Sequence, residues 1–510
     1  MNRTSFFIIL LALVCRAEAA EVTVNLGQTF QTIDGFGAFN SIEQLKVKQG
    51  PFYVDAPMEN HYDSLVHDLG ITIVRTFPPS DVNRGTDGHF EFDGAHGGLT
   101  TRNLSAFKDR GVNTFFTSVL SPPGYMKTNG ITTQGGHLKP EHYNDFADYC
   151  IDYINWAKTT LGIDFHGISL QNELGFSQPY ASCIYTPQEF VAVVNAVAPR
   201  FAQAGLTTKI YGPETMGTMN MHHPGGLGYY LPELEANAQA RNTVGLLPVH
   251  GYLDGVAPDY GSAPGWEAMA AAAGRLGVPL WMTETGGWDG DWPGAMKWAT
   301  AIHLALKHGN IGAWIWYRMS ADEADARDFM AAGKPTLVYF VHKHYYRFVR
   351  PGAVMVGASS NDPDVLVTAY HHKENDCVTI VAINHGNTTP FSLSGSGLPQ
   401  TFEVFQTSQL GRRCEMTGTL SPGQSFELPP SSITTFVSGT YRDEKPTSST
   451  QPFAPTILKS KAVQMHRGEY SRHNLSGRVL YTPWPLQANQ LLLRQGTKSI
   501  TLISDKGHRQ

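Results

Sequence analysis

The sequence predicts an α/β protein, a (β/α)8 TIM barrel with an appended antiparallel β-sandwich domain. Apolar, β-branched runs alternate with helical patterns over residues 32–345. After about residue 346, short alternating segments separated by Gly, Pro, Asn and Ser replace that pattern. The chain has 510 residues, too many for one ordinary core, so two or three domains are expected.

Eight runs have the composition of buried barrel strands. They are residues 32–39, 71–77, 113–120, 167–173, 209–214, 246–252, 279–284 and 313–319. Helical patterns lie between them, and one carries Thr186 as N-cap, Pro187 at its first position and Glu189 as the capping-box acid. Because strand–helix units repeat through the whole region, a closed barrel is favoured over an open sheet.

The domain boundaries follow from these patterns. The barrel is predicted at residues 21–345 and the sandwich at 346–440. Residues 21–30, EVTVNLGQTF, precede the barrel strands and read as a strand of their own. We expect them to pair with the sandwich.

The two ends of the chain differ from its body. Residues 1–20 place Arg3 before an apolar run and end in a small-x-small site, which predicts a signal peptide. That run is shorter than the ~20 apolar residues of a membrane-spanning helix. A secreted or extracellular protein is therefore expected, with a cell-surface or periplasmic location left open.

Residues 441–510 form a linker and a basic C-terminal module or tail, with 11 Lys and Arg against 4 Asp and Glu. A basic end on an acidic body has two interpretations, of which one is a module that contacts cell-surface or sorting machinery. The alternative is a small appended β-domain or a poorly ordered tail. The net charge of −6 argues against nucleic acid as a partner of the whole protein.

An exported chain would keep four of the five cysteines. Cys15 falls in the predicted signal peptide, which leaves Cys150, Cys183, Cys377 and Cys414, an even number. The order of the chain favours Cys150–Cys183 and Cys377–Cys414 disulfides, with free buried thiols as the alternative. No Cys or His spacing indicates a metal site, and no phosphate-binding loop or nucleophile elbow is present, so no cofactor is expected.

Two glutamates at strand ends are the candidate catalytic pair. Glu173 ends the fourth run in SLQNELGF, and Glu284 ends the seventh in WMTETGG. Side chains at the carboxyl ends of barrel strands converge on one site. Glycosidic bond cleavage needs one acid for the leaving oxygen and one carboxylate across the anomeric carbon. A single strand-end Glu is usually structural, but two in these positions favour a glycosidase.

These motifs resemble glycoside hydrolase family 30, within the clan of retaining (β/α)8 glycosidases. The stretches that carry the resemblance are QTIDGFGAFN (31–40), SPPGYMKTNG (121–130), SLQNELGF (169–176), VHGY (249–252), WMTETGG (281–287) and LPPSSITTF (428–436). The resemblance covers about residues 21–440.

The resemblance implies a role for each matching residue. Glu173 matches the acid/base and Glu284 the nucleophile, while Asn172 matches the residue that binds the sugar 2-hydroxyl. Tyr252 matches a residue whose aromatic hydroxyl contacts the nucleophile. Arg75 matches a supporting, positively charged residue that keeps the nucleophile ionised. Retention implies that the two carboxyl groups lie ~5–5.5 Å apart.

Two positions depart from the family pattern. Leu174 stands where the family commonly has Pro, and Tyr125 stands where it commonly has Trp. Tyr125 can still stack on a sugar, so it remains a candidate substrate-binding residue.

Three tryptophans are candidate sugar platforms. Trp288 and Trp292 lie in the loop after the seventh strand, where packing against a helix is the alternative. On the eighth strand we expect Trp316 to point into the barrel, together with Trp314 two residues before it, and to form a floor of the sugar site.

The resemblance implies a secreted retaining β-glycosidase that hydrolyses plant-type polysaccharide, with an endo-β-1,4-xylanase of the glucuronoxylanase type favoured. The alternatives are a β-1,6-glucanase or β-1,6-galactanase, and then a glucosylceramidase. A carbohydrate-binding surface protein on an inactive barrel is the non-enzymatic alternative, and the intact glutamate pair argues against it. Arg318 could meet an acidic side group of xylan, but a salt bridge with the acidic stretch 322–328 is the stronger expectation.

Overall fold

A computed structural model describes residues 19–41, 46–49, 52–55, 58–94, 97–253, 263–287, 290–321 and 327–439. Three features of the sequence analysis lie outside these residues. They are the predicted signal peptide up to residue 18, Trp288 and the basic segment 441–510.

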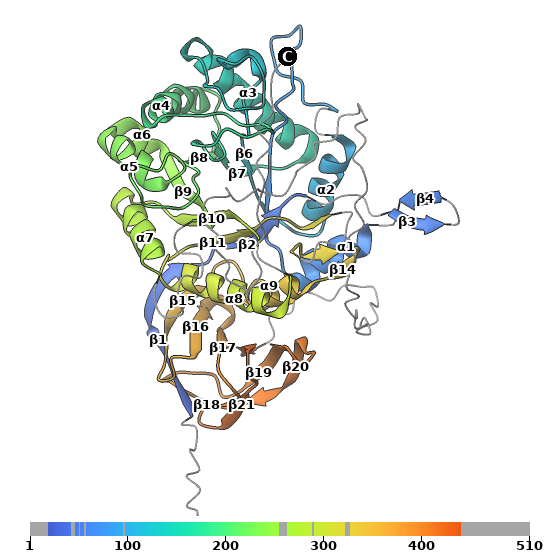
Figure 1. Ribbon diagram of the computed structural model, residues 1–510, viewed down its shortest axis with the longest axis vertical. Coiled ribbons are helices and arrows are strands. Elements are labelled where there is room, and N and C mark those ends of the chain that lie inside the picture. The colour runs from blue at the N-terminus through green and yellow to red at the C-terminus, as the bar shows by residue number, and fades with distance from the viewer. Residues whose placement is uncertain are drawn as a thin grey trace, which may run out of the picture. The chain divides into compact units, whose positions relative to one another are not determined.

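Eight parallel strands close into a barrel, which confirms the predicted fold class (Figure 1). Around the barrel they follow the order β10-β11-β2-β5-β6-β7-β8-β9. In chain order they are β2 (Gly35–Phe39), β5 (Ile73–Thr76), β6 (Thr114–Ser118), β7 (Phe165–Ser169), β8 (Lys209–Tyr211), β9 (Val244–His250), β10 (Leu280–Thr285) and β11 (Ala313–Trp316). Each overlaps one of the eight runs expected from the sequence.

Helices surround the barrel strands (Figure 1). They are α1 (Glu59–Asp63) with a π-helix (Ser64–Leu69), α2 (Gly97–Asp109), α3 (Tyr143–Trp156) with a π-helix (Ala157–Leu161), α4 (Pro187–Gln203), α5 (Leu227–Ala236), α6 (Ala238–Thr243), α7 (Pro264–Leu276), α8 (Trp292–Lys307) and α9 (Leu337–Tyr346). The capping box predicted for α4 is present: the Glu189 N–H donates to Thr186 Oγ1 at 3.2 Å, and the Thr186 N–H donates to Glu189 Oε2 at 2.7 Å.

The barrel encloses its own apolar core, formed by Ile73, Phe116, Tyr211, Leu246, Trp281, Ala313 and Ile315. Because alternate residues of a strand face opposite sides, inward Ala313 and Ile315 place Trp314 and Trp316 on the outside of β11. Both tryptophans belong to the larger core between strands and helices. The prediction that they point into the barrel is wrong.

The second domain is a nine-stranded sheet in the order β20-β19-β22-β17-β16-β15-β1-β18-β21. The strands are β1 (Ala20–Thr32), β15 (Val354–Ser360), β16 (Val365–His372), β17 (Cys377–Asn384), β18 (Thr389–Ser394), β19 (Phe402–Ser408), β20 (Arg413–Leu420), β21 (Ser425–Leu428) and β22 (Ser432–Val437). Phe391 of β18 stacks on Phe436 of β22 with ring centroids 4.9 Å apart, although four strands separate them in the order. The sheet therefore folds over itself and encloses a core, as a sandwich does.

Strand β1 joins the N-terminal part of the chain to the sandwich. It pairs antiparallel with β15, with Val22 opposite Ser360, and parallel with β18. Smaller pairings elsewhere are β3 (Lys46–Gln49) with β4 (Phe52–Asp55), and β12 (Ser320–Ala321) with β13 (Met330–Ala331) and β14 (Lys334–Pro335). Along the chain, the barrel strands therefore lie between β1 and β15, the first two strands of the sandwich.

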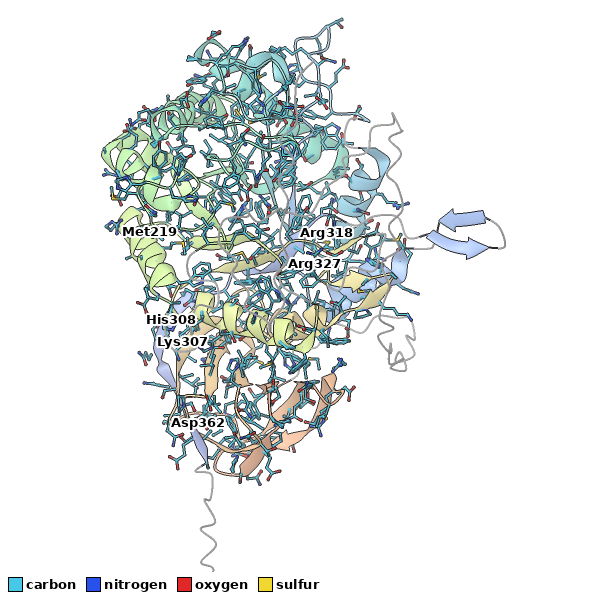
Figure 2. All side chains as sticks on the ribbon, in the orientation of Figure 1. Met219, Lys307, His308, Arg318, Arg327 and Asp362 are labelled. Carbon is cyan, nitrogen blue, oxygen red and sulfur yellow. The ribbon has the colours of Figure 1, made fainter. Side chains whose placement is uncertain are left out.

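Side chains of α8 and α9 connect the barrel to the sandwich. His344 contacts the hydroxyl groups of Thr435 at 2.8 Å and Thr407 at 2.7 Å. The indole N–H of Trp292 donates to Ser431 Oγ at 2.9 Å, and this tryptophan is buried. Trp292 is therefore a packing residue, but its hydrogen-bond partner belongs to the sandwich and not to a neighbouring helix. Figure 2 shows Lys307 and His308, where α8 ends, on the side of the barrel that faces the sandwich.

The predicted disulfides are absent. Cys150, Cys183, Cys377 and Cys414 are free thiols, and all four are buried. Cys377 opens β17 and Cys414 lies on β20, with β22 and β19 between them in the sheet. Strands spaced ~4.8 Å apart place these two cysteines beyond the ~7 Å limit for Cα atoms joined by a disulfide. Within the described part of the chain, no helix is long and apolar enough to cross a membrane.

Candidate active site

Glu173 reaches the carboxyl end of the barrel through an unusual backbone conformation. Strand β7 ends at Ser169, and the next residues bond to both neighbouring strand extensions: the Asn172 N–H donates to Val119 O at 2.7 Å, and the Glu173 N–H donates to Glu214 O at 3.0 Å. Glu173 has φ of 48°, a left-handed conformation that side chains other than glycine rarely adopt. Such conformations concentrate at functional sites, where the surrounding bonds hold them.

Glu284 is directed to the same place by an irregularity in β10. The register of β10 shifts against β9 between Met282 and Glu284, and against β11 between Met282 and Thr285. A bulge of this kind turns a side chain to the other face of a strand. Directly after it, a Cβ on Gly286 would lie 2.3 Å from Tyr317 O, so the chain can pass there only with glycine.

The two predicted catalytic carboxylates are close together. A carboxylate oxygen of Glu173, a ring nitrogen of His250 and a carboxylate oxygen of Glu284 all lie within 4.8 Å of one another. Glu173 is buried, and the side chain of Glu284 is 12% exposed. The pair is therefore placed to act on one group from two directions.

Arg75 of β5 joins three of the site residues. Its Nη1 pairs with Glu284 Oε2, and its Nη2 donates to Asn172 Oδ1 at 2.6 Å and to Glu214 Oε1 at 3.2 Å. Its Nε donates to Ser118 Oγ at 3.2 Å. Burial opposes the charge of Arg75, but Glu214 and Glu284 outweigh this and raise its pKa. Arg75 therefore stays a cation with no exposed surface.

Tyr252 holds the second oxygen of Glu284. Its hydroxyl donates to Glu284 Oε1 at 2.9 Å. Burial, and then the charge of Glu284, raise the pKa of Tyr252 well above its usual value. The hydroxyl therefore remains a hydrogen-bond donor, and both oxygens of Glu284 have fixed partners.

Two residues of this site were missed by the sequence analysis. Glu214 follows β8 and is fully buried, and Thr283 Oγ1 donates to its Oε1 at 2.8 Å. His250 ends β9; its Nδ1 lies 2.9 Å from Glu173 Oε1 and its Nε2 lies 3.4 Å from Glu214 Oε1. A signal existed for both, because Glu214 also ends an expected strand and His250 lies in the VHGY motif.

The charges of these groups depend on one another. Burial raises the pKa of Glu173 above its usual value, although His250 opposes this. Burial disfavours the charged form of His250 too, but the carboxylates of Glu284, Glu173 and Glu214 raise its pKa to about 9. For Glu214, the Arg75 guanidinium outweighs burial and lowers the pKa far below the usual range. A proton is thus held on His250 while Glu214 remains ionised.

Glu173, His250 and Glu284 have the spacing of a possible metal site. The two glutamates already have cationic partners: Arg75 pairs with Glu284, and the His250 imidazolium contacts Glu173. A metal ion at this position would face both positive charges at short range. The donor set therefore fits proton transfer better than metal binding.

Other predicted site residues lie elsewhere. Trp316 is fully buried, with its ring centroid 4.6 Å from that of Trp298 and 5.8 Å from that of Phe329, so it forms no floor for a sugar. Tyr125 is 45% exposed and packs edge-on against His142 at 5.4 Å. Trp288 lies outside the described residues.

Arg318 follows β11 and forms the expected salt bridge. Its Nε lies 3.0 Å from Asp328 Oδ1 and 3.2 Å from Asp328 Oδ2. In Figure 2, Arg318 and Arg327 lie over the barrel strands, away from the sandwich. Asp328 thus already neutralises Arg318.

Comparison with known proteins supports the same chemistry. Residues 81–222, which include Glu173, match the sequence model of the O-glycosyl hydrolase family 30. The resemblance to glycoside hydrolase family 30 is confirmed. Glucuronoxylanase XynC of Bacillus subtilis is 26% identical over 448 residues, which cover 82% of this chain and 92% of that protein.

Solved structures have a similar fold over most of the chain. The family 30 subfamily 8 xylanase Xyn30A of Clostridium acetobutylicum superposes with a TM-score of 0.64 at 24% identity, over 82% of this chain and 99% of that chain. The endo-β1,6-glucanase BT3312 has a TM-score of 0.64 at 17% identity, over 83% and 95% of the two chains. At these identities the likeness concerns the fold, and with the family match it supports a glycoside hydrolase.

Proposed function

We propose that the chain is an exported retaining β-glycosidase that cleaves plant-type polysaccharide, specifically an endo-β-1,4-xylanase of the glucuronoxylanase type. One observation carries the proposal: Glu173 and Glu284 present carboxylate oxygens within 4.8 Å of each other at the carboxyl end of the barrel. Retaining enzymes hold their two carboxyl groups ~5–5.5 Å apart, whereas inverting enzymes leave ~6.5–9.5 Å for a water molecule.

In the first step, an oxygen of Glu284 forms a bond to the anomeric carbon while the bond to the leaving oxygen breaks. Glu173 transfers its proton to that leaving oxygen. The partners on Glu284 support this role, because Arg75 pairs with one of its oxygens and the Tyr252 hydroxyl donates to the other. The raised pKa of Glu173 supports the role of acid.

In the second step, water attacks the anomeric carbon and gives a proton to the Glu173 carboxylate. The bond between the sugar and Glu284 breaks, which restores both residues. Asn172 accepts from Arg75 through Oδ1, which directs its amide nitrogen away from the guanidinium. That nitrogen is the group we assign to the sugar 2-hydroxyl.

The choice of xylan rests on the relative XynC, a glucuronoxylanase that matches most of this chain. Because Arg318 is paired with Asp328, we assign it no contact with an acidic side group. Export rests on the signal-like residues 1–20 of the sequence.

A substrate screen tests the proposal. Purified protein is incubated with xylan, glucuronoxylan, β-1,6-glucan and arabinogalactan, and products are sized. Glu173→Ala and Glu284→Ala should each lose at least about 10³-fold in kcat, since each removes one of the two carboxylates that do the chemistry. With an activated aryl glycoside, whose leaving group needs no proton, azide should restore part of the activity of Glu173→Ala and give a glycosyl azide, because azide attacks the glycosyl-enzyme without a general base.

The matched control is Glu235→Ala on α5, a glutamate that pairs with Arg275 on the outer helices. It should retain full activity. Wild-type rates in both active-site variants would overturn the catalytic assignment. Binding of xylan without release of reducing sugar would favour the non-enzymatic alternative, and selective cleavage of β-1,6-glucan would replace xylan as the substrate.

A further inference from the structure

Five ionisable groups are gathered in one buried cluster at the carboxyl end of the barrel. Three are carboxylates and two are cations: Glu173, Glu214, Glu284, Arg75 and His250. Each comes from a different strand end, and the Tyr252 ring lies beside that of His250 with centroids 6.0 Å apart. The mechanism above uses Glu173, Glu284 and Arg75 but leaves Glu214 and His250 without a role.

Neither Glu214 nor His250 is placed to touch a substrate. Both side chains have no exposed surface. Glu214 Oε1 receives the Thr283 hydroxyl and the Arg75 guanidinium, and lies 3.4 Å from His250 Nε2. On its other side, His250 Nδ1 lies 2.9 Å from Glu173. The imidazole thus lies between the acid/base residue and a carboxylate whose pKa is lowered by Arg75.

We propose that Glu214 and His250 form a charge-balancing pair, which keeps the buried cluster neutral in both halves of the double displacement. The inference rests on the proposed function. Both are positioning residues that act through Glu173. Because burial of a net charge is costly, a cluster that stays neutral avoids that cost at each stage.

In the free enzyme, Glu173 carries its proton, and Glu214 and Glu284 are ionised. Arg75 and the His250 imidazolium supply two positive charges, which cancel the two negative ones. Without the proton on His250, the cluster would hold one uncompensated negative charge.

In the glycosyl-enzyme, Glu284 is an ester and has lost its charge, while Glu173 has given its proton to the leaving group and is ionised. The two carboxylates are now Glu173 and Glu214, and the same two cations cancel them. His250 then donates to the Glu173 carboxylate, which is the base of the second step. The negative charge moves from Glu284 to Glu173, and the imidazolium lies within reach of both.

A second buried histidine, His344, has hydroxyl groups as neighbours where His250 has carboxylates. His344 contacts two threonine hydroxyls and no carboxylate, and burial lowers its pKa to about 3. It provides a matched control in the same protein. His344→Asn should leave the pH dependence of hydrolysis unchanged.

The pH profile of kcat/KM on the preferred polysaccharide tests the pair, because the two variants should shift it in opposite directions. His250→Asn removes a cation beside Glu173, so the alkaline limb should move up by about one pH unit or more. Glu214→Gln removes a negative charge, so the limb should move down by a similar amount. Loss of activity with an unshifted limb in both variants would overturn the inference, since a purely structural role predicts that result.

A pre-steady-state experiment examines the second step. With an activated aryl glycoside, His250→Asn should slow deglycosylation at neutral pH by about 10-fold or more, because Glu173 without the neighbouring cation keeps its proton to higher pH and less of the base form is present. The glycosyl-enzyme should then accumulate and be seen by intact mass. Raising the pH should restore the rate. Equal slowing of both steps would contradict the neutral-cluster argument.

A readout without turnover separates this inference from the proposed function. Nitrogen-15 histidine spectra should show His250 protonated on both ring nitrogens at pH 7. In the Glu214→Gln variant, the His250 imidazolium should lose its proton at a lower pH than in the wild type. A neutral His250 in an active wild-type enzyme would overturn the inference alone. Absence of hydrolysis by the wild type would overturn the proposed function. If His250→Asn does not fold, the nitrogen-15 spectrum of the wild type and the pH profile of Glu214→Gln still test the charge-balancing pair.

Discussion

The hydroxyl of Tyr252 donates to Oε1 of Glu284 at 2.9 Å, while Arg75 pairs with the other oxygen of the same carboxylate. Strands β5 and β10 and the turn after β9 thus fix the rotation of the nucleophile before any sugar is bound. A carboxylate held by donors on both oxygens is already in the orientation that attack requires.

Replacing Tyr252 by Phe should lower kcat about 10- to 100-fold, because a hydrogen bond to a charged group contributes about 1.5–3 kcal/mol. The variant should fold normally, since the ring is kept. Steady-state kinetics and thermal unfolding measure the two effects.

Tyr339→Phe serves as the control for Tyr252→Phe. Tyr339 lies on α9, outside the candidate site, and its hydroxyl donates to Asp68 Oδ2 at 2.6 Å. It should lower the unfolding temperature and leave kcat unchanged. A Tyr252→Phe enzyme with wild-type kcat would show that Arg75 alone orients the nucleophile.

Replacing Arg75 by Met should lower the free energy of unfolding by about 3–5 kcal/mol, because Glu214 and Glu284 would lose their buried cation. Urea denaturation measures the loss. The double variant Arg75→Met/Glu214→Gln should recover part of it, since one of the unpaired charges is removed. A double variant less stable than the single one would contradict this account of the cluster.

Stability should fall on both sides of neutral pH. The pKa of His250 is raised to about 9, so its stabilising contribution is complete below its ordinary value of 6.5 and is lost as the pH rises towards 9. The pKa of His342 and of His344 is lowered to about 3 by burial, so their contribution is complete above 6.5 and is lost as the pH falls towards 3. Unfolding temperatures across this range should show a maximum near neutrality.

Single variants separate the two limbs of that stability curve. His250→Asn should flatten the alkaline limb alone, and His344→Asn should flatten part of the acid limb alone. An alkaline limb that is unchanged in His250→Asn would show that another group titrates there.

The four described cysteines should behave as free thiols. Cys150, Cys183, Cys377 and Cys414 should resist a thiol reagent in the native protein and all react once it is unfolded, because burial shields each of them. Reducing agent should not change the unfolding temperature. Fewer than four reactive thiols from these positions in the unfolded chain would indicate a disulfide.

The sequence was sufficient for the barrel, because β-branched runs at regular spacing leave few other arrangements. The approximate positions of Glu173 and Glu284 followed from the same pattern. The side of the strand on which Trp316 lies did not follow, because it depends on the pleat set by Ala313 and Ile315. A one-residue difference in that pleat exchanges the inner and outer faces.

The missed residues have a related cause. Glu214 and His250 are recognisable only through their distances to Glu173, which join three different strand ends. The separation of Cys377 from Cys414 likewise depends on the order of strands in the sheet, which is not the order in the chain. Long-range order of this kind leaves no local trace in composition or spacing.

The pairing of β1 with β15 affects how the protein is made. During translation β1 leaves the ribosome first, but its antiparallel partner Val354–Ser360 follows only after the last barrel strand. Until then the edges of β1 are unpaired, and exposed strand edges promote association between nascent chains. We expect chains that stop within the barrel to need chaperones or to aggregate, because both edges of β1 are paired only after synthesis has passed Ser394 of β18.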